Sequence, residues 1–293
     1  MKMFSHANER LAYEETGAGP AVLLLHCSSS NHHQWRRLGE LIGKSFRVLA
    51  PDLSGHGVSL NEAGERQKCN DLTALRGLIE HLKSPVIIVG HGYGASLALE
   101  LALLQSARCR AFCLIEALPF GLLNADAPLY QQQAEVLDKL QQKVHKGQLA
   151  SAARRYMSFW AGLGHWLGLP RQDKLLLEQY LPLALQEWQY QQSLGRGIRA
   201  DLAALNKAVT LVHGSKSTAL SRQLQRELIA CLPQANQIIV RDAGHMSPTS
   251  HSEQINAIVY NFLQGFLLKE TSPGLNPQEP GAASEKRPVF SSF

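Results

Sequence analysis

The chain has 293 residues, 45% of them hydrophobic, which suffices for one large α/β domain with an insertion or for two small domains. Its net charge is +5, but the basic residues are scattered in short pairs without interleaved aromatics, so we expect a solvated surface and no nucleic-acid partner. No apolar run reaches the ~18 to 20 residues needed to span a bilayer, and the N-terminus lacks the apolar core of a signal peptide, so we expect a soluble, cytoplasmic protein without a membrane partner.

The cysteines indicate neither a disulfide framework nor a zinc site. They are odd in number and lack C-x-x-C spacing, at positions Cys27, Cys69, Cys109, Cys113 and Cys231. Reduced thiols are expected, with no metal and no cofactor.

In chain order, the sequence first predicts two short strands, a turn and a buried parallel strand, at residues 3–6, 10–15, 17–20 and 21–25. The third strand ends in a small polar loop, His26-Cys-Ser-Ser-Ser-Asn31, ahead of a helix that carries Trp35. A further strand at 47–50 runs into Pro51-Asp-Leu-Ser-Gly-His-Gly57. A full βα unit and paired strands therefore precede residue 85.

The chain is organised around residues 85–100, where a β-branched apolar run leads into a glycine-rich turn and then into helix formers. Two fingerprints fit this turn. In Gly90-x-Gly92-x-x-Ala95, glycines would let a dinucleotide's pyrophosphate approach the backbone, and Glu116 would hold a ribose. In Gly90-His91-Gly92-Tyr93-Gly94, they would permit the sharp turn of a nucleophile elbow, G-x-S-x-G. A dinucleotide turn normally comes first in its domain, so the position favours the elbow.

The second half begins with an expected strand at 111–115, which ends in Glu116. From 118 to 205 strand signals vanish, and helical segments rich in Gln and Leu are broken by Gly and Pro. Strands at 208–213 and 237–241 resume the sheet, with helices at about 220–231 and 252–268. The tail from 271 onward has almost no apolar residue, so we expect it to be disordered.

Four landmarks in this order resemble those of the α/β-hydrolase superfamily: an H-G-like loop at His26-Cys27, P-D-x-x-G-x-G at 51–57, the elbow, and Ala243-Gly-His-Met246. The resemblance covers roughly residues 4 to 267. It implies an α/β-hydrolase fold, in which helices flank a mostly parallel central sheet and a helical cap is inserted after strand 6. The expected division is a core of 1–117 and 206–268, a cap of 118–205 and a disordered tail of 269–293.

The resemblance also assigns catalytic positions. His245 matches the superfamily's catalytic histidine. The usual acid position after the seventh strand holds Ser217, which cannot stabilise an imidazolium as a carboxylate does. Glu116 ends the sixth strand, where the haloalkane-dehalogenase-like branch can carry its acid, and we assign it that role. Asp242 is a weaker candidate, three residues before His245.

The chain is also similar to a group of bacterial α/β hydrolases in which the acid is the glutamate. The motifs that carry this likeness are His26-Cys-Ser, Leu114-Ile-Glu-Ala and Gly244-His-Met-Ser-Pro-Thr-Ser-His251.

The main departure from these relatives is Gly92, which stands where they keep serine. Glycine offers no nucleophile for an acyl-enzyme. Ser96 and Cys27 are poor substitutes, since Ser96 lies one turn into the helix and Cys27 lies in the oxyanion loop. An oxyanion hole from the Tyr93 N–H and an N–H of Cys27 or Ser28 would remain.

The aromatic residues of the cap could line the roof of a substrate pocket. They are Tyr156, Phe159, Trp160, Trp166, Trp188 and Tyr190, and of these we assign Tyr156, Trp160 and Trp166 to substrate binding.

Three functions follow for a small-molecule substrate or ligand. The first is a hydrolase-type enzyme on a small ester, thioester or lactone, with a general-base pair of His245 and Glu116 and no serine nucleophile. The second is a catalytically inactive pseudoenzyme that binds a ligand under the cap. The third is a dinucleotide-binding protein. Turnover that is lost when His245 is removed would identify the enzyme. Ligand binding that does not depend on His245 would identify the pseudoenzyme, and tight NAD(H) binding would identify the dinucleotide-binding protein.

Overall fold

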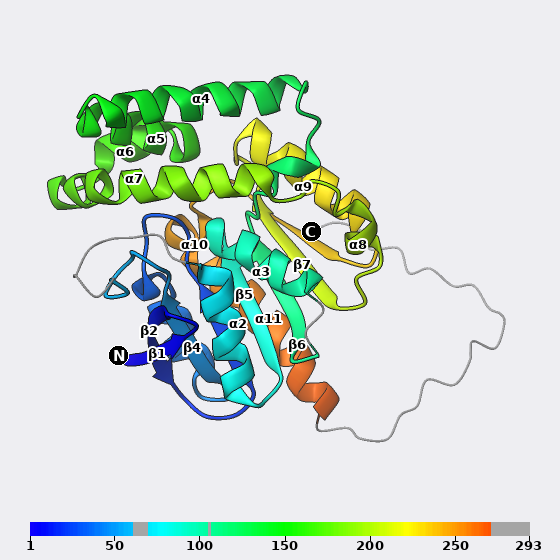
Figure 1. Ribbon diagram of the computed structural model, residues 1–293. Helices are drawn as coiled ribbons and strands as arrows, with labels where there is room; N and C mark the ends of the chain where they lie inside the picture. Colours follow the sequence, from blue (N-terminus) through cyan, green and yellow to red (C-terminus); the bar gives the residue numbers. More distant parts are fainter. Residues whose placement is uncertain (61–69, 105–106, 271–293) are drawn as a thin grey trace, which may run out of the picture.

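A single mixed sheet with strand order β1-β2-β4-β3-β5-β6-β7-β8 forms the centre of the computed structural model, which describes residues 1–60, 70–104 and 107–270 (Figure 1). The strands are β1 (Lys2–His6), β2 (Glu9–Thr16), β3 (Ala21–Leu25), β4 (Arg47–Asp52), β5 (Val86–His91), β6 (Cys109–Ile115), β7 (Ala208–Gly214) and β8 (Asn236–Val240). Strand β2 pairs antiparallel with both β1 and β4, and the pairs from β4 through β8 are parallel. The predicted mostly parallel α/β architecture is confirmed.

Some helices of the described chain cover the two faces of this sheet, and others form a layer above it. They are η1 (His32–Trp35), α1 (Arg36–Ile42), α2 (Asp71–Leu82), α3 (Tyr93–Leu103), η2 (Phe120–Leu122), α4 (Pro128–His145), α5 (Leu149–Ala161), α6 (Leu163–Gly168), α7 (Arg171–Ser193), α8 (Arg199–Ala203), α9 (Ala219–Cys231), α10 (Ser247–Ser250) and α11 (Ser252–Glu270). None of the helices in the described ranges combines the length and apolar character that a bilayer crossing requires.

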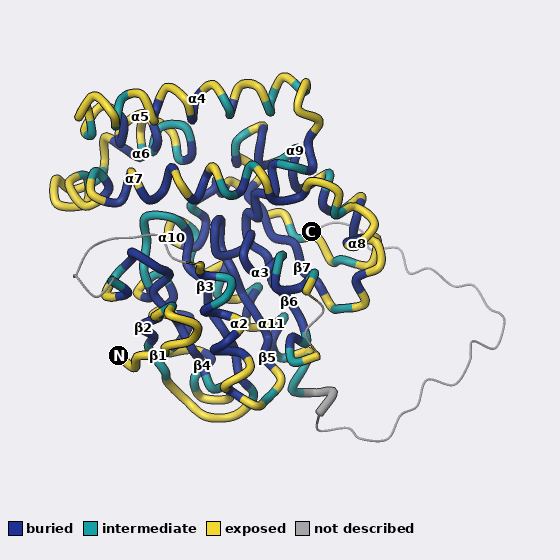
Figure 2. The backbone as a smooth tube through the Cα atoms, in the orientation of Figure 1, coloured by how far each residue is buried: buried dark blue, intermediate teal, exposed yellow. Residues whose placement is uncertain are grey.

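The apolar strand runs are explained by this two-sided covering. All five residues of β3 are buried, and its alternate side chains enter different cores. Leu23 and Leu25 pack with α2 and α3, whereas Val22 and Leu24 pack with α1 and α11. Parallel strands buried on both faces have continuous apolar sequences rather than alternating ones. Figure 2 shows this buried sheet between its more exposed helices.

The segment between β6 and β7 forms a separate layer, here called the cap and defined as α4 to α7 (Figure 1). Its interior is an apolar cluster that includes Leu140, Tyr156, Leu181 and Trp188. The ring centroids of Trp160 and Trp188, two members of this cluster, lie 4.9 Å apart. The cap lies over the carboxyl ends of the strands, where open α/β sheets place their ligand sites.

The C-terminal helix continues further than the predicted boundary. Helix α11 ends at Glu270, so residues 269 and 270 belong to it rather than to the predicted tail. The remainder of that predicted tail, from 271 to 293, lies outside the described residues, as does Cys69. The other four cysteines are buried free thiols.

Candidate active site

The turn between β5 and α3 has glycine at three positions, and two different reasons favour it. Gly92 has φ 56° and ψ −114°, a conformation that side-chain-bearing residues rarely adopt. Gly90 and Gly94 are required for packing instead. A Cβ on Gly90 would lie 2.4 Å from the Gly94 carbonyl oxygen, and a Cβ on Gly94 would lie 2.4 Å from the Leu25 carbonyl oxygen. The strand, the turn and the helix are therefore in very close contact.

The side chain that Gly92 lacks would point at His245. An ideal Cβ on Gly92 would lie 3.5 Å from His245 Nε2 and 3.1 Å from the Cβ of Cys27. The imidazole therefore faces the position at which a nucleophile would stand. The Cys27 side chain partly occupies the same space.

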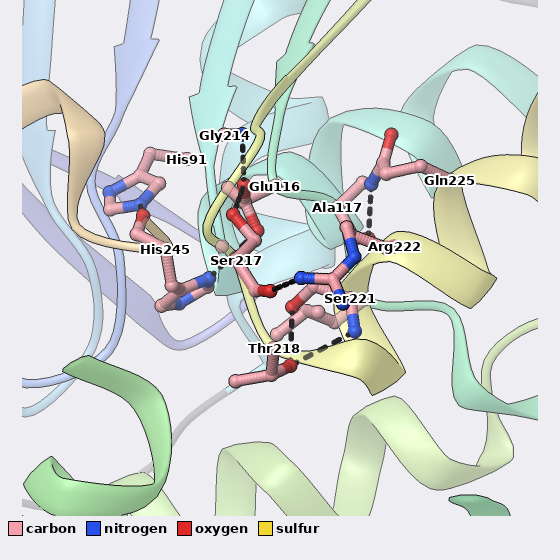
Figure 3. A network of polar contacts seen from close by, with 12 residues as sticks. His91, Glu116, Ala117, Gly214, Ser217, Thr218, Ser221, Arg222, Gln225 and His245 are labelled. Atoms are coloured by element: carbon pink, nitrogen blue, oxygen red, sulfur yellow. Dashed lines mark hydrogen bonds and ion pairs between the residues drawn. The ribbon is translucent and has the colours of Figure 1, made fainter. Parts of the chain in front are cut away.

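Glu116 holds the other ring nitrogen of His245. Its Oε2 lies 3.3 Å from His245 Nδ1, and the carboxylate is fully buried (Figure 3). Its Oε1 accepts hydrogen bonds from the Gly214 N–H at 2.8 Å and from Ser217 Oγ at 2.5 Å. Burial alone would raise the pKa of Glu116, but the hydrogen bonds and the charge of His245 outweigh it and hold that pKa below its ordinary value. The carboxylate is therefore ionised at neutral pH.

Ser217, which follows the seventh strand, supports the acid. Its hydroxyl donates to Glu116, and its own carbonyl accepts a hydrogen bond from the Arg222 guanidinium (Figure 3). Sequence reasoning considered Ser217 only as a missing acid and did not find this role. Asp242 faces solvent and forms an ion pair of 2.8 Å with Lys216, so it does not orient His245.

Two aromatic groups fix the histidine loop. The Trp160 ring centroid lies 4.8 Å from that of His245, and the His91 centroid lies 5.3 Å away on β5. His91 Nε2 donates to the His245 carbonyl at 2.9 Å. Burial, together with the nearby His245, lowers the pKa of His91 to about 3. His91 is consequently neutral across the physiological range.

The buried His91 should make the protein sensitive to acid. In the unfolded chain this imidazole takes up a proton near pH 6.5, whereas in the folded chain it does so only near 3. Between these values the unfolded state binds more protons, so the free energy of unfolding falls by about 1.4 kcal/mol per pH unit as the pH decreases. We expect His91→Gln to remove this slope. Urea unfolding between pH 6.5 and 4 measures it, and the exposed His145→Gln serves as control. An unchanged slope in His91→Gln would contradict the assignment.

The oxyanion donors differ in part from those predicted. The Cys27 N–H donates to Gln34 Oε1 at 3.3 Å, so the predicted Cys27 donor is already engaged. The Ser28 N–H makes no hydrogen bond within the described part of the chain. The Tyr93 N–H belongs to the first residue of α3, where amide groups point away from the helix body and carry the positive end of its dipole. Ser28 and Tyr93 remain as candidate donors.

A cavity of about 100 Å³ lies between this turn and the cap. Its lining comprises Cys27, Ser28, Ser29, Ser30, Tyr93, Leu118, Tyr156, Met157, Trp160, Ala184, Trp188, Gln191, His245 and Met246. Of the assigned substrate-binding residues, Tyr156 and Trp160 line it, but Trp166 does not. Trp166 packs inside the cap, where the Lys174 ammonium lies 5.4 Å from its ring centroid.

Two lining residues that sequence reasoning missed lie on α7. Ala184 and Gln191 flank Trp188 at spacings of four and three, so the three residues share one face of the helix. This helical spacing around Trp188 could have identified both residues from the sequence. The residues contributed by loops, such as Met246, gave no comparable signal.

Neither Ser96 nor Cys27 is activated as a nucleophile. The single hydroxyl hydrogen of Ser96 lies within reach of the Gly92 carbonyl and of Gln191 Oε1, and Ser96 Oγ accepts from the Leu118 N–H. It therefore ties α3 to the cap. Burial, reinforced by the negative charge of Glu187, raises the pKa of the Cys27 thiol to about 12, so Cys27 is not a thiolate at neutral pH. Among the described residues, no group of three or more His, Cys, Asp or Glu could hold a metal ion.

Comparison with known proteins gives matches over most of the chain. A model of the alpha/beta hydrolase family matches residues 22–258. The pimeloyl-acyl-carrier-protein methyl ester esterase of Nitrosospira multiformis is 25% identical over 244 residues, which cover 78% of this chain and 91% of that protein. The enol-lactonase structure from Burkholderia xenovorans superposes with a TM-score of 0.70 at 16% identity, covering 90% of this chain and 100% of that one.

A shorter match has higher identity. The magnesium-chelatase 30 kDa subunit of Rhodobacter capsulatus is 37% identical over 87 residues, which cover 29% of this chain and 31% of that protein. The chain therefore spans about a third of the length of this relative.

Proposed function

Because this chain belongs to the alpha/beta hydrolase family, we propose that it is a hydrolase-type enzyme for a small ester, thioester or lactone, in which His245 activates water directly. The observation that carries the proposal is the 3.5 Å between His245 Nε2 and the Cβ position over Gly92. A water molecule beyond that position, where the hydroxyl of a serine would stand, would be within reach of a base whose other nitrogen is held by an ionised Glu116. The relatives named for ester and lactone cleavage support the substrate class.

The proposed reaction needs no acyl-enzyme. His245 Nε2 removes a proton from water while the oxygen bonds to the substrate carbonyl carbon, and the carbonyl oxygen becomes negatively charged. The N–H groups of Tyr93 and Ser28 would hold that charge. The imidazolium, stabilised by Glu116, then returns its proton to the leaving oxygen or sulfur as the carbonyl–leaving-group bond breaks. The proton that His245 takes from water is thus the one that it returns to the leaving group, and no further proton donor is needed.

The cavity supports a small substrate with an apolar acyl group. Its volume of about 100 Å³ exceeds the roughly 10–15 Å³ that one water molecule needs, so water and a short acyl group fit together. Trp160, Trp188 and Tyr156 provide aromatic walls on the cap side. Glu116, which a dinucleotide site would direct at a ribose, is instead buried against His245 and Ser217.

A panel of short-chain esters, lactones and thioesters, assayed on wild type and on His245→Ala, tests the proposal. We expect kcat/KM to fall by about 10² to 10⁴ in the variant, the usual contribution of a general base. Cys27→Ala and the exposed His145→Ala should both keep wild-type activity. A single turnover in ¹⁸O-labelled water should place the label in the released acid, with no acylated protein detected by mass spectrometry.

Other outcomes would select other functions. Ligand binding that is indifferent to His245, without turnover of any panel member, would identify a ligand-binding pseudoenzyme. Tight NAD(H) binding would restore the dinucleotide interpretation. Activity lost in Cys27→Ala, with an acylated thiol in wild type, would replace water by covalent catalysis.

A further inference from the structure

Helix α6 and the start of α7 expose several large apolar side chains at one end of the cap. Four leucines between residues 163 and 176 are exposed by 38% to 64%, namely Leu163, Leu167, Leu175 and Leu176. They are four of the eleven exposed large hydrophobic residues in the described part of the chain. Leu163 and Leu167 lie one turn apart on α6, while Trp166 between them is buried. Scattered single apolar residues are ordinary, but such a concentration marks an interaction surface.

These leucines gather where the cap helices turn around. Figure 1 shows the C-terminal end of α4, the start of α5, α6 and the start of α7 at the same end of the cap. The ammonium of Lys174 on α7 donates to the Leu167 carbonyl at 3.3 Å, which joins the end of α6 to the first turns of α7. We call this end, residues 143–178, the cap tip.

The cap tip also carries most of the protein's excess positive charge. It has six Lys or Arg residues and two acidic residues, Asp173 and Glu178, whereas the rest of the chain has 23 basic and 22 acidic residues. The basic residues are Lys143, Lys146, Arg154, Arg155, Arg171 and Lys174. In the sequence they are short pairs and single residues, which is why the sequence predicted only a solvated surface. The fold brings the helix ends around which they lie to the same end of the cap (Figure 1).

We propose that the cap tip docks on an anionic lipid surface. Exposed leucines flanked by Lys and Arg are the two components of interfacial binding, since the leucines enter the boundary of the acyl chains and the cations attract the headgroups. A nucleic acid would use the cations but not the leucines. The surface belongs to the cap, and Tyr156, Met157 and Trp160 of the same stretch line the cavity. The inference goes beyond the proposed function and does not depend on it.

Co-sedimentation with vesicles of equal parts phosphatidylglycerol and phosphatidylcholine tests this docking, with pure phosphatidylcholine vesicles for comparison. We expect binding only to the anionic vesicles, weakened by salt. The exposed-residue variant Lys146→Gln/Arg154→Gln/Arg171→Gln should lower the partition coefficient by about fivefold per charge, or about 100-fold in total. Leu163→Gln/Leu167→Gln should lower it by about tenfold.

Matched variants elsewhere on the surface provide the controls. Leu41→Gln/Ile239→Gln changes two exposed apolar residues, and Arg36→Gln/Arg37→Gln/Arg241→Gln changes three exposed cations. Both should bind vesicles like wild type. Equal losses in the cap-tip and control variants, or no vesicle binding, would overturn the proposal. Self-association that the Leu163→Gln/Leu167→Gln variant abolishes, without vesicle binding, would replace it with a second copy of the chain. Binding of duplex DNA stronger than vesicle binding would also overturn it.

Discussion

Gly92→Ser is expected to raise ester hydrolysis by at least about 10²-fold, because in the proposed site an activated nucleophile is the one component of acyl transfer that is missing. The new Cβ would lie 3.5 Å from His245 Nε2, which brings a hydroxyl within hydrogen-bond reach of the base. Glu116 already holds Nδ1 of that histidine. The variant should therefore react with a fluorophosphonate probe and give a burst with p-nitrophenyl acetate, as wild type should not.

The same substitution should lower stability. A non-glycine residue at φ 56° is strained by about 1–3 kcal/mol. The new Cβ would also meet the Cβ of Cys27 at 3.1 Å, tighter than normal packing. Removing that atom with Cys27→Gly in the Gly92→Ser background should therefore recover part of the loss. Urea unfolding of the two variants measures both effects.

Two further variants make the activity gain interpretable. Adding Glu116→Gln to Gly92→Ser should remove most of it, because the imidazolium would lose its carboxylate partner. The exposed Gly164→Ser has nothing within 4 Å of the added atom and should neither hydrolyse esters nor bind the probe. A folded Gly92→Ser protein with neither burst nor labelling would show that the site has diverged beyond its nucleophile, and the pseudoenzyme interpretation would then replace the hydrolase.

Gly94→Ala is expected to destabilise the protein by about 3 kcal/mol or more, a large part of the total stability of a typical domain. The added methyl group would lie 2.4 Å from the Leu25 carbonyl oxygen and 2.5 Å from that of His26. Both contacts are with backbone, so no side chain can rotate away. Strand β3 and helix α3 would have to separate, and with them the loop after β3 and the turn before α3.

Urea unfolding monitored by tryptophan fluorescence measures this loss. Gly164→Ala is the matched control, because it adds the same methyl group to an exposed helical position with open space around it. Its stability should be unchanged or higher by up to about 1 kcal/mol, since alanine favours helix over glycine. A loss below about 1 kcal/mol in Gly94→Ala would mean that β3 and α3 are not in such tight contact.

The fold could be predicted from the sequence because its signals are local. The buried run of β3 was predicted at its observed bounds, and the four ordered landmarks fixed the fold class. Helix α2 was not predicted, although Leu75, Leu78 and Leu82 recur on one face of it. The sequence therefore contained the signal for this helix.

The site was less predictable because it depends on contacts between distant residues. Ser217 meets Glu116 across 101 positions, and no local pattern says that its hydroxyl donates to the acid. Likewise, only the fold reveals that Gln34 engages the Cys27 N–H. Trp160 and Trp166 look alike in the sequence, but the first faces the cavity and the second the cap interior. Residue type and spacing indicate which chemistry is possible, whereas direction and burial decide which residues perform it.

The short contact between Ser217 and Glu116 limits how this site can be redesigned. An aspartate at 217 would place a second carboxylate beside the first, in a region where both side chains are almost fully buried. Two carboxylates at such a distance cannot both ionise, and one would keep a proton at neutral pH. The site therefore accommodates one ionised carboxylate, either after β6 or after β7. A designer who wants the acid on β7 must remove Glu116 in the same step.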